Sequence, residues 1–145
     1  MNEQDAKTLA RQTMSKCMFP AFATVDEHGC PQIRAMMPTT IDDDFTSYYI
    51  TSRQSAKCRH ITANPKVSSL WTDVVDPMSD WRSVLVKGKA DISEDKALRE
   101  RFWMDELTFA FPAGVDDPNY VILIVKPTEM ILADHQTMPP LVVKL

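Results

Sequence analysis

The chain has 145 residues, 44% of them hydrophobic, and a formal net charge of −4. This size fits one globular domain with room for a buried core. The mild acidity argues against a general nucleic-acid binder, which needs a basic surface to neutralise phosphates. The longest apolar run, residues 120–125, is too short to cross a membrane.

The three cysteines show no CxxC motif and no metal-ligand spacing. The first residues, Asn2-Glu3-Gln4-Asp5, are polar and charged, which does not fit a signal peptide. We therefore expect a reduced, cytoplasmic protein without a bound metal. An acidic run, Asp42–Asp44, lacks the spaced ligands and the bidentate Glu of a calcium loop, so it is predicted to be a solvated turn.

The first half of the chain predicts a helix followed by a hairpin. Asn2 is a plausible cap, and apolar residues recur at helical spacing up to Cys17. A tight turn at Asp26–Gly29 then joins two strands. The elements predicted here are a helix over 2–17 and strands over 18–25, 31–40 and 47–51.

The second half predicts a short helix that ends at Asn64-Pro65, because a residue before proline is driven out of the helical region. Gly88, inside a long strand, suggests a bulge or a close approach of other atoms. Ser93 starts a helix that runs to about Leu107. The other predicted elements are strands over 66–73, 81–92, 120–126 and 129–134, loops over 74–80 and 111–118, and a tail over 136–145 without periodicity.

Hairpin-length connections and few helices predict a mostly antiparallel sheet of six or seven strands in an α+β fold. Short strands of this number usually close into a barrel, which removes the sheet edges. The sequence therefore predicts one small α+β barrel domain over residues 1–145, with flanking helices.

A basic stretch lies at the start of the short central helix. Residues 45–72 contain no Asp or Glu, but they hold four cations, Arg53, Lys57, Arg59 and Lys66. Cations at a helix N-terminus cost about 0.3–1 kcal/mol each, and a bound anion would reverse that sign. Backbone N–H groups, the Thr51, Ser52 and Ser55 hydroxyls and two cations could then face one phosphate. The alternative is a solvated basic turn with Ser52 or Ser55 as an ordinary N-cap.

No catalytic constellation stands by itself in this sequence. GxSxG, GxGxxG and GxxxxGK[ST] are all absent, and the three histidines are isolated. His60 fits a packed or solvated helix residue, with a cofactor contact as the alternative. If the protein is an enzyme, we expect a bound cofactor to supply the chemistry.

Three pieces of sequence, in order, carry a family resemblance. They are Ala23-Thr24-Val25 with Ile33-Arg34-Ala35-Met36-Met37, Ile50-Thr51 with Ser55, Lys57 and Asn64-Pro65, and Ser83 to Ala90 with Trp103 and the loop 111–118. The chain resembles the FMN-binding split-barrel proteins related to pyridoxamine 5′-phosphate oxidase, in particular the short general stress protein type. The resemblance implies a split barrel, a homodimer with FMN in the cleft between protomers, and a flavin-dependent oxidoreductase acting on a small substrate.

The resemblance also implies which residues contact FMN. Arg34, Thr51, Ser55 and Lys57 would hold the phosphate, and the backbone of 35–37 would lie along the flavin ring. The complete implied set is Arg34, Ala35, Met36, Met37, Ile50, Thr51, Ser52, Ser55, Lys57, Ser83 and Trp103. For Met36 and Met37 the alternative is barrel packing, and for Trp103 it is the core of its own helix.

Two departures from the family pattern matter. The oxidase has an Arg-Lys pair at the phosphate, but Ala56 precedes Lys57 here, and Arg53 or Arg59 are candidate replacements. Residues 136–145 have no counterpart of the segment that binds the oxidase substrate, so vitamin B6 oxidation is not expected. The alternative functions are a flavin carrier or sensor, and a haem or deazaflavin binder on the same barrel.

Overall fold

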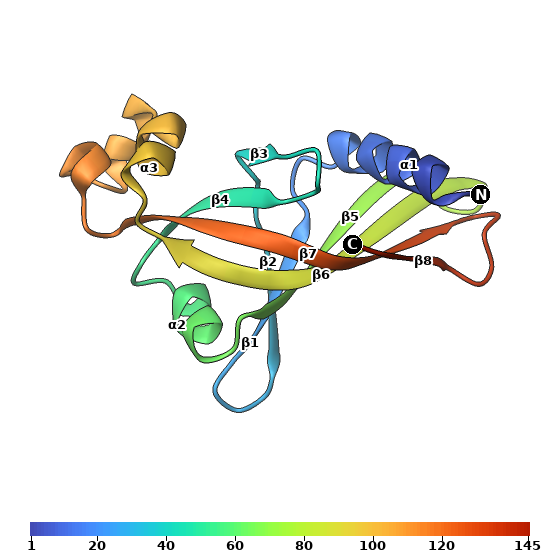
Figure 1. The fold of residues 1–145 in the computed structure, drawn as a ribbon, viewed down its shortest axis with the longest axis horizontal. Helices are drawn as coiled ribbons and strands as arrows, with labels where there is room; N and C mark the ends of the chain where they lie inside the picture. The colour runs from blue at the N-terminus through green and yellow to red at the C-terminus, as the bar shows by residue number, and fades with distance from the viewer.

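An antiparallel sheet curls around the core in the computed structural model, which describes residues 1–145 (Figure 1). Three α-helices and two short 3₁₀ helices flank this sheet. The helices are α1 (Glu3–Lys16), α2 (Ala56–Ala63) and α3 (Lys96–Phe102), and the 3₁₀ helices span Asp105–Phe109 and Gly114–Asp116. The strands are β1 (Ala21–Val25), β2 (Pro31–Ala35), β3 (Thr40–Ile41), β4 (Ser47–Ser52), β5 (Lys66–Asp76), β6 (Asp80–Ser93), β7 (Tyr120–Asp134) and β8 (Leu141–Lys144).

The strands are ordered β2-β1-β5-β6-β7-β4-β3, with β8 added on β7. Every pairing is antiparallel. No hydrogen-bonded pair joins β2 to β3 or β4, so the two ends of the sheet leave an open seam. The predicted α+β split barrel is confirmed. It has eight strands and not six or seven, because the tail pairs Leu141–Lys144 with β7.

The long strands run further than the sequence predicted. The expected loop 74–80 shrinks to a hairpin tip, since Val74 pairs with Trp81 and Asp76 with Asp80. The predicted break at Pro127 is also wrong, because β7 is continuous through it. A bulge beside Gly88 lets Pro127 sit opposite that residue without donating a hydrogen bond.

The close approach predicted at Gly88 is confirmed. A Cβ there would lie 2.3 Å from the carbonyl oxygen of Lys126 on β7. The turn predicted at Asp26–Gly29 also forms, with Gly29 at φ +77°, a conformation that glycine adopts at low cost. Both glycines therefore fix the path of a strand.

Three apolar clusters fill the fold, and the helices cover them. Asn2 caps α1 as predicted, accepting from the Asp5 N–H at 2.8 Å, and α1 packs over Trp71 and its neighbours. The helix predicted from Ser93 to Leu107 ends at Phe102 and gives way to a 3₁₀ helix, and the strand predicted over 31–40 splits into β2 and β3. The barrel interior holds Phe22, Met36 and Tyr49, while α3 covers Tyr120 and Ile122 on the outside of β7.

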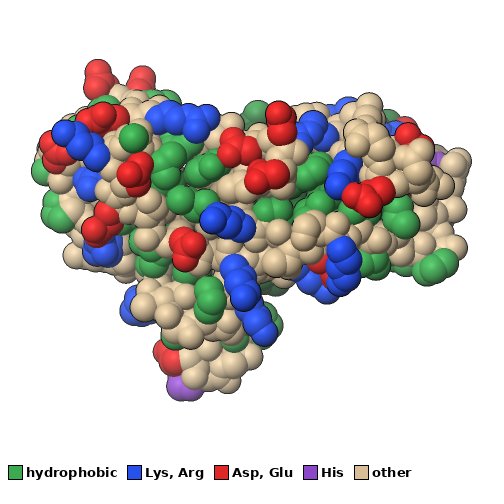
Figure 2. Space-filling model, in the orientation of Figure 1, with side chains coloured by type: hydrophobic (Ala, Val, Ile, Leu, Met, Phe, Trp, Pro, Cys, Tyr) green, Lys and Arg blue, Asp and Glu red, His purple; other side chains and the backbone are tan.

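The cysteines at positions 17, 30 and 58 are unpaired. None of the helices has the length and apolar character needed to cross a membrane. On the face drawn in Figure 2, acidic side chains gather over the α3 end, and basic side chains follow one another near the middle.

Candidate cofactor-binding site

Three predicted phosphate ligands converge where β4 passes into α2. The Lys57 ammonium on α2 donates to the Thr51 hydroxyl at the end of β4, at 3.0 Å. The hydroxyls of Thr51 and Ser55 lie 3.4 Å apart. Ser55 is the N-cap residue of α2, yet its side chain makes no capping hydrogen bond. Ser55 therefore occupies the N-cap position, as in the alternative interpretation, but its hydroxyl lies beside the Thr51 hydroxyl instead of accepting from the helix.

Arg34 approaches this cluster from β2, on the other side of the seam. Its guanidinium donates to the carbonyls of Phe22 and Gln32 and, at 2.8 Å, to the Thr24 hydroxyl. The same hydroxyl lies 2.8 Å from Nδ1 of His60 on α2, and both partners are buried. This chain of contacts ties β1, β2 and α2 together, so it holds Arg34 at the seam.

The two cations of the site have no acidic partner. Neither Lys57 nor Arg34 takes part in an ion pair. Burial lowers the pKa of Lys57, and the nearby Arg34 charge lowers it further, against a smaller opposing effect of Cys58. Burial also lowers the pKa of Arg34. A bound anion would offset both costs, because an opposite charge within a few ångströms favours the charged form of each group.

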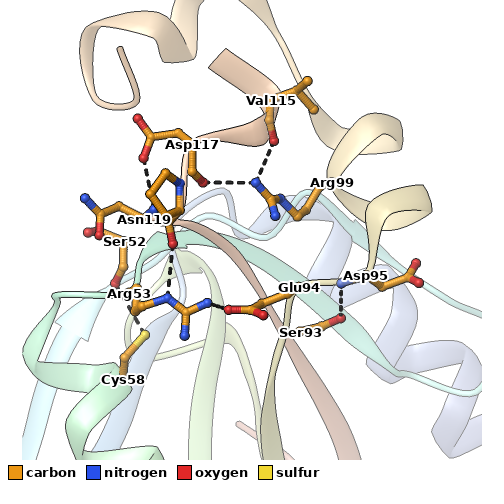
Figure 3. A network of polar contacts seen from close by, with 11 residues as sticks. Ser52, Arg53, Cys58, Ser93, Glu94, Asp95, Arg99, Val115, Asp117 and Asn119 are labelled. Carbon is orange, nitrogen blue, oxygen red and sulfur yellow. Dashed lines mark hydrogen bonds and ion pairs between the residues drawn. The ribbon is translucent and has the colours of Figure 1, made fainter. Parts of the chain in front are cut away.

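Arg53 does not replace the arginine that is missing at Ala56. Its guanidinium forms an ion pair with Glu94 and donates from Nε to the Pro118 carbonyl at 3.0 Å (Figure 3). Its own N–H donates to the Asn119 carbonyl at 2.8 Å, so Arg53 anchors the loop before β7.

Arg59 does not replace it either. Two positions after Lys57 on α2, it points about 200° away around the helix. It lines a groove with Thr62 and Ile92 instead. Lys57 and Arg34 are therefore the cations that the structure brings to the seam.

The residues predicted beside the flavin ring divide between core and surface. The Met36 side chain is buried among Phe22 and Tyr49, as in the barrel-packing alternative. Met37 and Ala35 are exposed. Ile50 packs in the cluster under α3, and the Ser52 hydroxyl accepts from the Gln54 N–H at 3.3 Å.

Ser83 and Trp103 lie away from the phosphate ligands of their own chain. Ser93 on β6 is level with the phosphate ligands, because it pairs with Ile122 on β7 and Ile122 pairs with Ile50 on β4. Ser83, which pairs with Ala133, lies ten residues before Ser93, which corresponds to about 33 Å along β6. Trp103 stacks edge-on against Tyr120 at 5.3 Å in the cluster under α3, as in the core alternative, and this cluster lies on the face of β4 opposite to Thr51. A single chain therefore does not bring these two residues to Lys57.

Two contributors to the site were not predicted from the sequence: Thr24, and the contact that the His60 side chain makes with it. Thr24 occupies a buried strand position, and His60 follows Lys57 by about one helical turn. The spacing of Lys57 and His60 along one helix was the available signal. The partner of His60, Thr24, lies on β1 and is distant in the sequence, so the contact could not be predicted from the residues around position 60.

Comparisons with known proteins find matches that span nearly the whole chain. The sequence model of the family described as pyridoxamine 5′-phosphate oxidase matches residues 7–133. General stress protein 26 of Bacillus subtilis (strain 168) is 32% identical over 145 residues, covering 100% of both chains. The crystal structure of General Stress Protein 26 from Bacillus anthracis str. Sterne aligns with a TM-score of 0.76 and 28% identity, covering 97% of this chain and 98% of that one.

A second crystal structure, of a general stress protein 26-related protein from Clostridium acetobutylicum, aligns with a TM-score of 0.79 and 21% identity. It covers 99% of this chain and 97% of that one, and at this identity it supports the fold alone. The family match spans most of the sequence, and the curated relative matches it from end to end. The chain belongs to the pyridoxamine 5′-phosphate oxidase family.

Proposed function

We propose that this protein binds FMN at the seam of its barrel and acts as a flavin-dependent oxidoreductase on a small substrate. The observation that carries the proposal is the pair of cations, Lys57 and Arg34, which lie near each other at the seam without an acidic partner. A phosphate monoester carries about −1.5 to −2 charges at neutral pH, which matches two cations. The Thr51 and Ser55 hydroxyls and the N-terminus of α2 complete an anion site of the kind that flavin phosphates need.

Solved structures with this fold include proteins with different ligands. An FMN-binding protein from Nostoc punctiforme aligns with a TM-score of 0.62 and 17% identity, and an F420 reductase with 0.61 and 26%. A heme-binding protein from Mycobacterium smegmatis aligns with 0.73 and 15%. Haem needs an axial ligand to its iron, and His60, the histidine beside the seam, is buried and packs against Thr24. We therefore favour a flavin over haem.

We further propose that a second copy of the chain completes the site. On the face of the sheet opposite α1, an apolar row crosses six strands, and the core clusters include none of its members. The row consists of Ala35, Ala21, Leu70, Leu85, Ile131 and Val142. Leu70 is 41% exposed and Val142 50% exposed. Such a self-complementary band suits a two-fold homodimer, in which Ser83 would reach the partner's flavin.

When bound, FMN would supply hydride or electron transfer at the flavin ring. The chain's own groups would fix its phosphate, through Lys57 and Arg34, and flank the ring with the exposed backbone of 35–37. The tail forms β8 on the sheet instead of a substrate-binding arm, so we do not assign vitamin B6 oxidation. The unpaired cysteines support a cytoplasmic location.

The absorbance spectrum of the purified protein, followed by titration with FMN, tests the proposal. We expect flavin absorption bands and saturable quenching of FMN fluorescence. A haem spectrum, or a colourless protein that does not bind added FMN, would contradict it. Oxidation of NADH or NADPH by the yellow protein would then separate an enzyme from a flavin carrier or sensor.

A further inference from the structure

A row of three lysines crosses the outer face of the sheet, away from the seam. Lys66 on β5 pairs directly with Lys89 on β6, and Lys89 pairs directly with Lys126 on β7. All three side chains are exposed, in a chain whose net charge is −4. Basic side chains follow one another across this part of the molecule in Figure 2, where β7, β6 and β5 lie side by side in Figure 1.

The neighbouring acids leave this lysine row without ion pairs. Glu129, one row away, is already bound by Lys87 at 2.9 Å and by Lys144. Asp91, the next outward residue on β6, makes no ion pair, and Asp44 senses the Lys126 charge only at a distance. Like charges directly opposite each other on neighbouring strands are destabilising. The row therefore carries a local electrostatic cost that no ion pair of this chain offsets.

The lysine row borders a hollow of about 420 Å³. Lys66 and Lys89 of the row line one side of it beside Lys87, Lys126 is not among its lining residues, and Ala23, Val25 and Pro31 form an apolar wall on the other side. This volume is within the range of small-molecule sites, which combine apolar walls with a few charged groups. Neighbouring strands lie about 4.8 Å apart, so the flexible side chains of Lys66 and Lys89 can converge on one group of linked phosphates.

We propose that this hollow binds a small molecule that carries a diphosphate and an apolar ring, such as a nucleoside diphosphate. The diphosphate lies over Lys66 and Lys89, and the ring lies over Ala23, Val25 and Pro31. The site faces the outside of the sheet, whereas Arg34 points to the Thr24 side that faces α2. Thr24 also contributes to the lining of the hollow, but neither Lys57 nor Arg34 does. The hollow is therefore distinct from the proposed flavin phosphate site, and its proposed ligand does not depend on FMN.

Thermal unfolding of the full-length protein at low ionic strength, with ADP, inorganic pyrophosphate or adenosine, tests the proposal. Lys89→Gln removes the central charge of the row, and Lys96→Gln removes an exposed charge on α3 as a matched control. Lys57→Ala disables the flavin phosphate site. We expect ADP, and more weakly pyrophosphate, to raise the Tm of the wild type and of the Lys96 and Lys57 variants, and adenosine to have no effect. In the Lys89 variant, calorimetry should show ADP binding weakened at least about tenfold.

The ligand-free Lys89→Gln protein should unfold at the same temperature as the wild type or higher, because it loses two like-charge pairs. This result would also show that the variant folds. The site is refuted if the wild type shows no shift with ADP, or if the Lys89 variant retains it. Loss of the ADP shift in Lys57→Ala would place the anion at the seam instead. A response to adenosine equal to that to ADP would exclude the assigned phosphate contacts, and an equal response to pyrophosphate would exclude the assigned ring contacts.

Discussion

Replacing Lys57 with alanine should separate recognition of the flavin phosphate from recognition of the ring. The Lys57 ammonium is half-buried, lies 3.0 Å from the Thr51 hydroxyl and has no acidic partner. A hydrogen bond to a charged group contributes about 1.5–3 kcal/mol. At about 1.4 kcal/mol per tenfold change in affinity, the variant should bind FMN roughly 10- to 150-fold more weakly.

Riboflavin, which lacks the phosphate, provides the internal control for this variant. Its affinity should change by less than about threefold, because Lys57 makes no contact that a ring would need. Fluorescence titrations of both flavins against wild type, Lys57→Ala and the exposed control Lys96→Ala give the comparison. Equal weakening of FMN and riboflavin would show that Lys57 acts through packing, and unchanged FMN binding would refute the phosphate anchor.

Three further predictions concern pH, packing and assembly. Burial, and to a smaller extent the Arg34 charge, lower the pKa of Lys57 in the folded protein, so the unfolded chain holds that proton more tightly. The free energy of unfolding of the ligand-free protein should therefore rise with pH between the lowered pKa and about 10.4. Urea unfolding between about pH 8 and 11 should lose this component of the slope in Lys57→Met, and parallel curves would contradict it. Gly88→Ala places a Cβ 2.3 Å from the Lys126 carbonyl oxygen, which should lower the free energy of unfolding by about 1–3 kcal/mol; an unchanged urea midpoint would refute this. Leu70→Glu should convert the proposed dimer to a monomer by light scattering, and a dimer that persists would exclude the apolar row as the interface.

The sequence by itself determined the features that depend on neighbours along the chain. The Asn2 cap, the turn at Gly29 and the end of α2 before Pro65 all form as predicted, because capping, φ preference and proline geometry act within a few residues. Thr51, Ser55 and Lys57 lie within seven residues of each other, so their meeting at one helix start was also visible in the sequence.

Only the tertiary structure decided what distant segments do to each other. Arg34 meets the α2 cluster because β2 ends the sheet at the seam, and a buried contact between Thr24 and His60 holds it there. Arg53 forms an ion pair with Glu94, which is distant in the sequence, so no pattern around residue 53 predicts this contact.

Strand pairing sets the remaining features. β7 continues through Pro127 because Thr128, an extra residue of β7, forms a bulge opposite Lys87 and Gly88 of β6, and the tail becomes β8 because β7 offers it a free edge. The same register aligns Lys66, Lys89 and Lys126. Register depends on which strands meet and where, and that is fixed by burial of the whole sheet and not by any local run of residues.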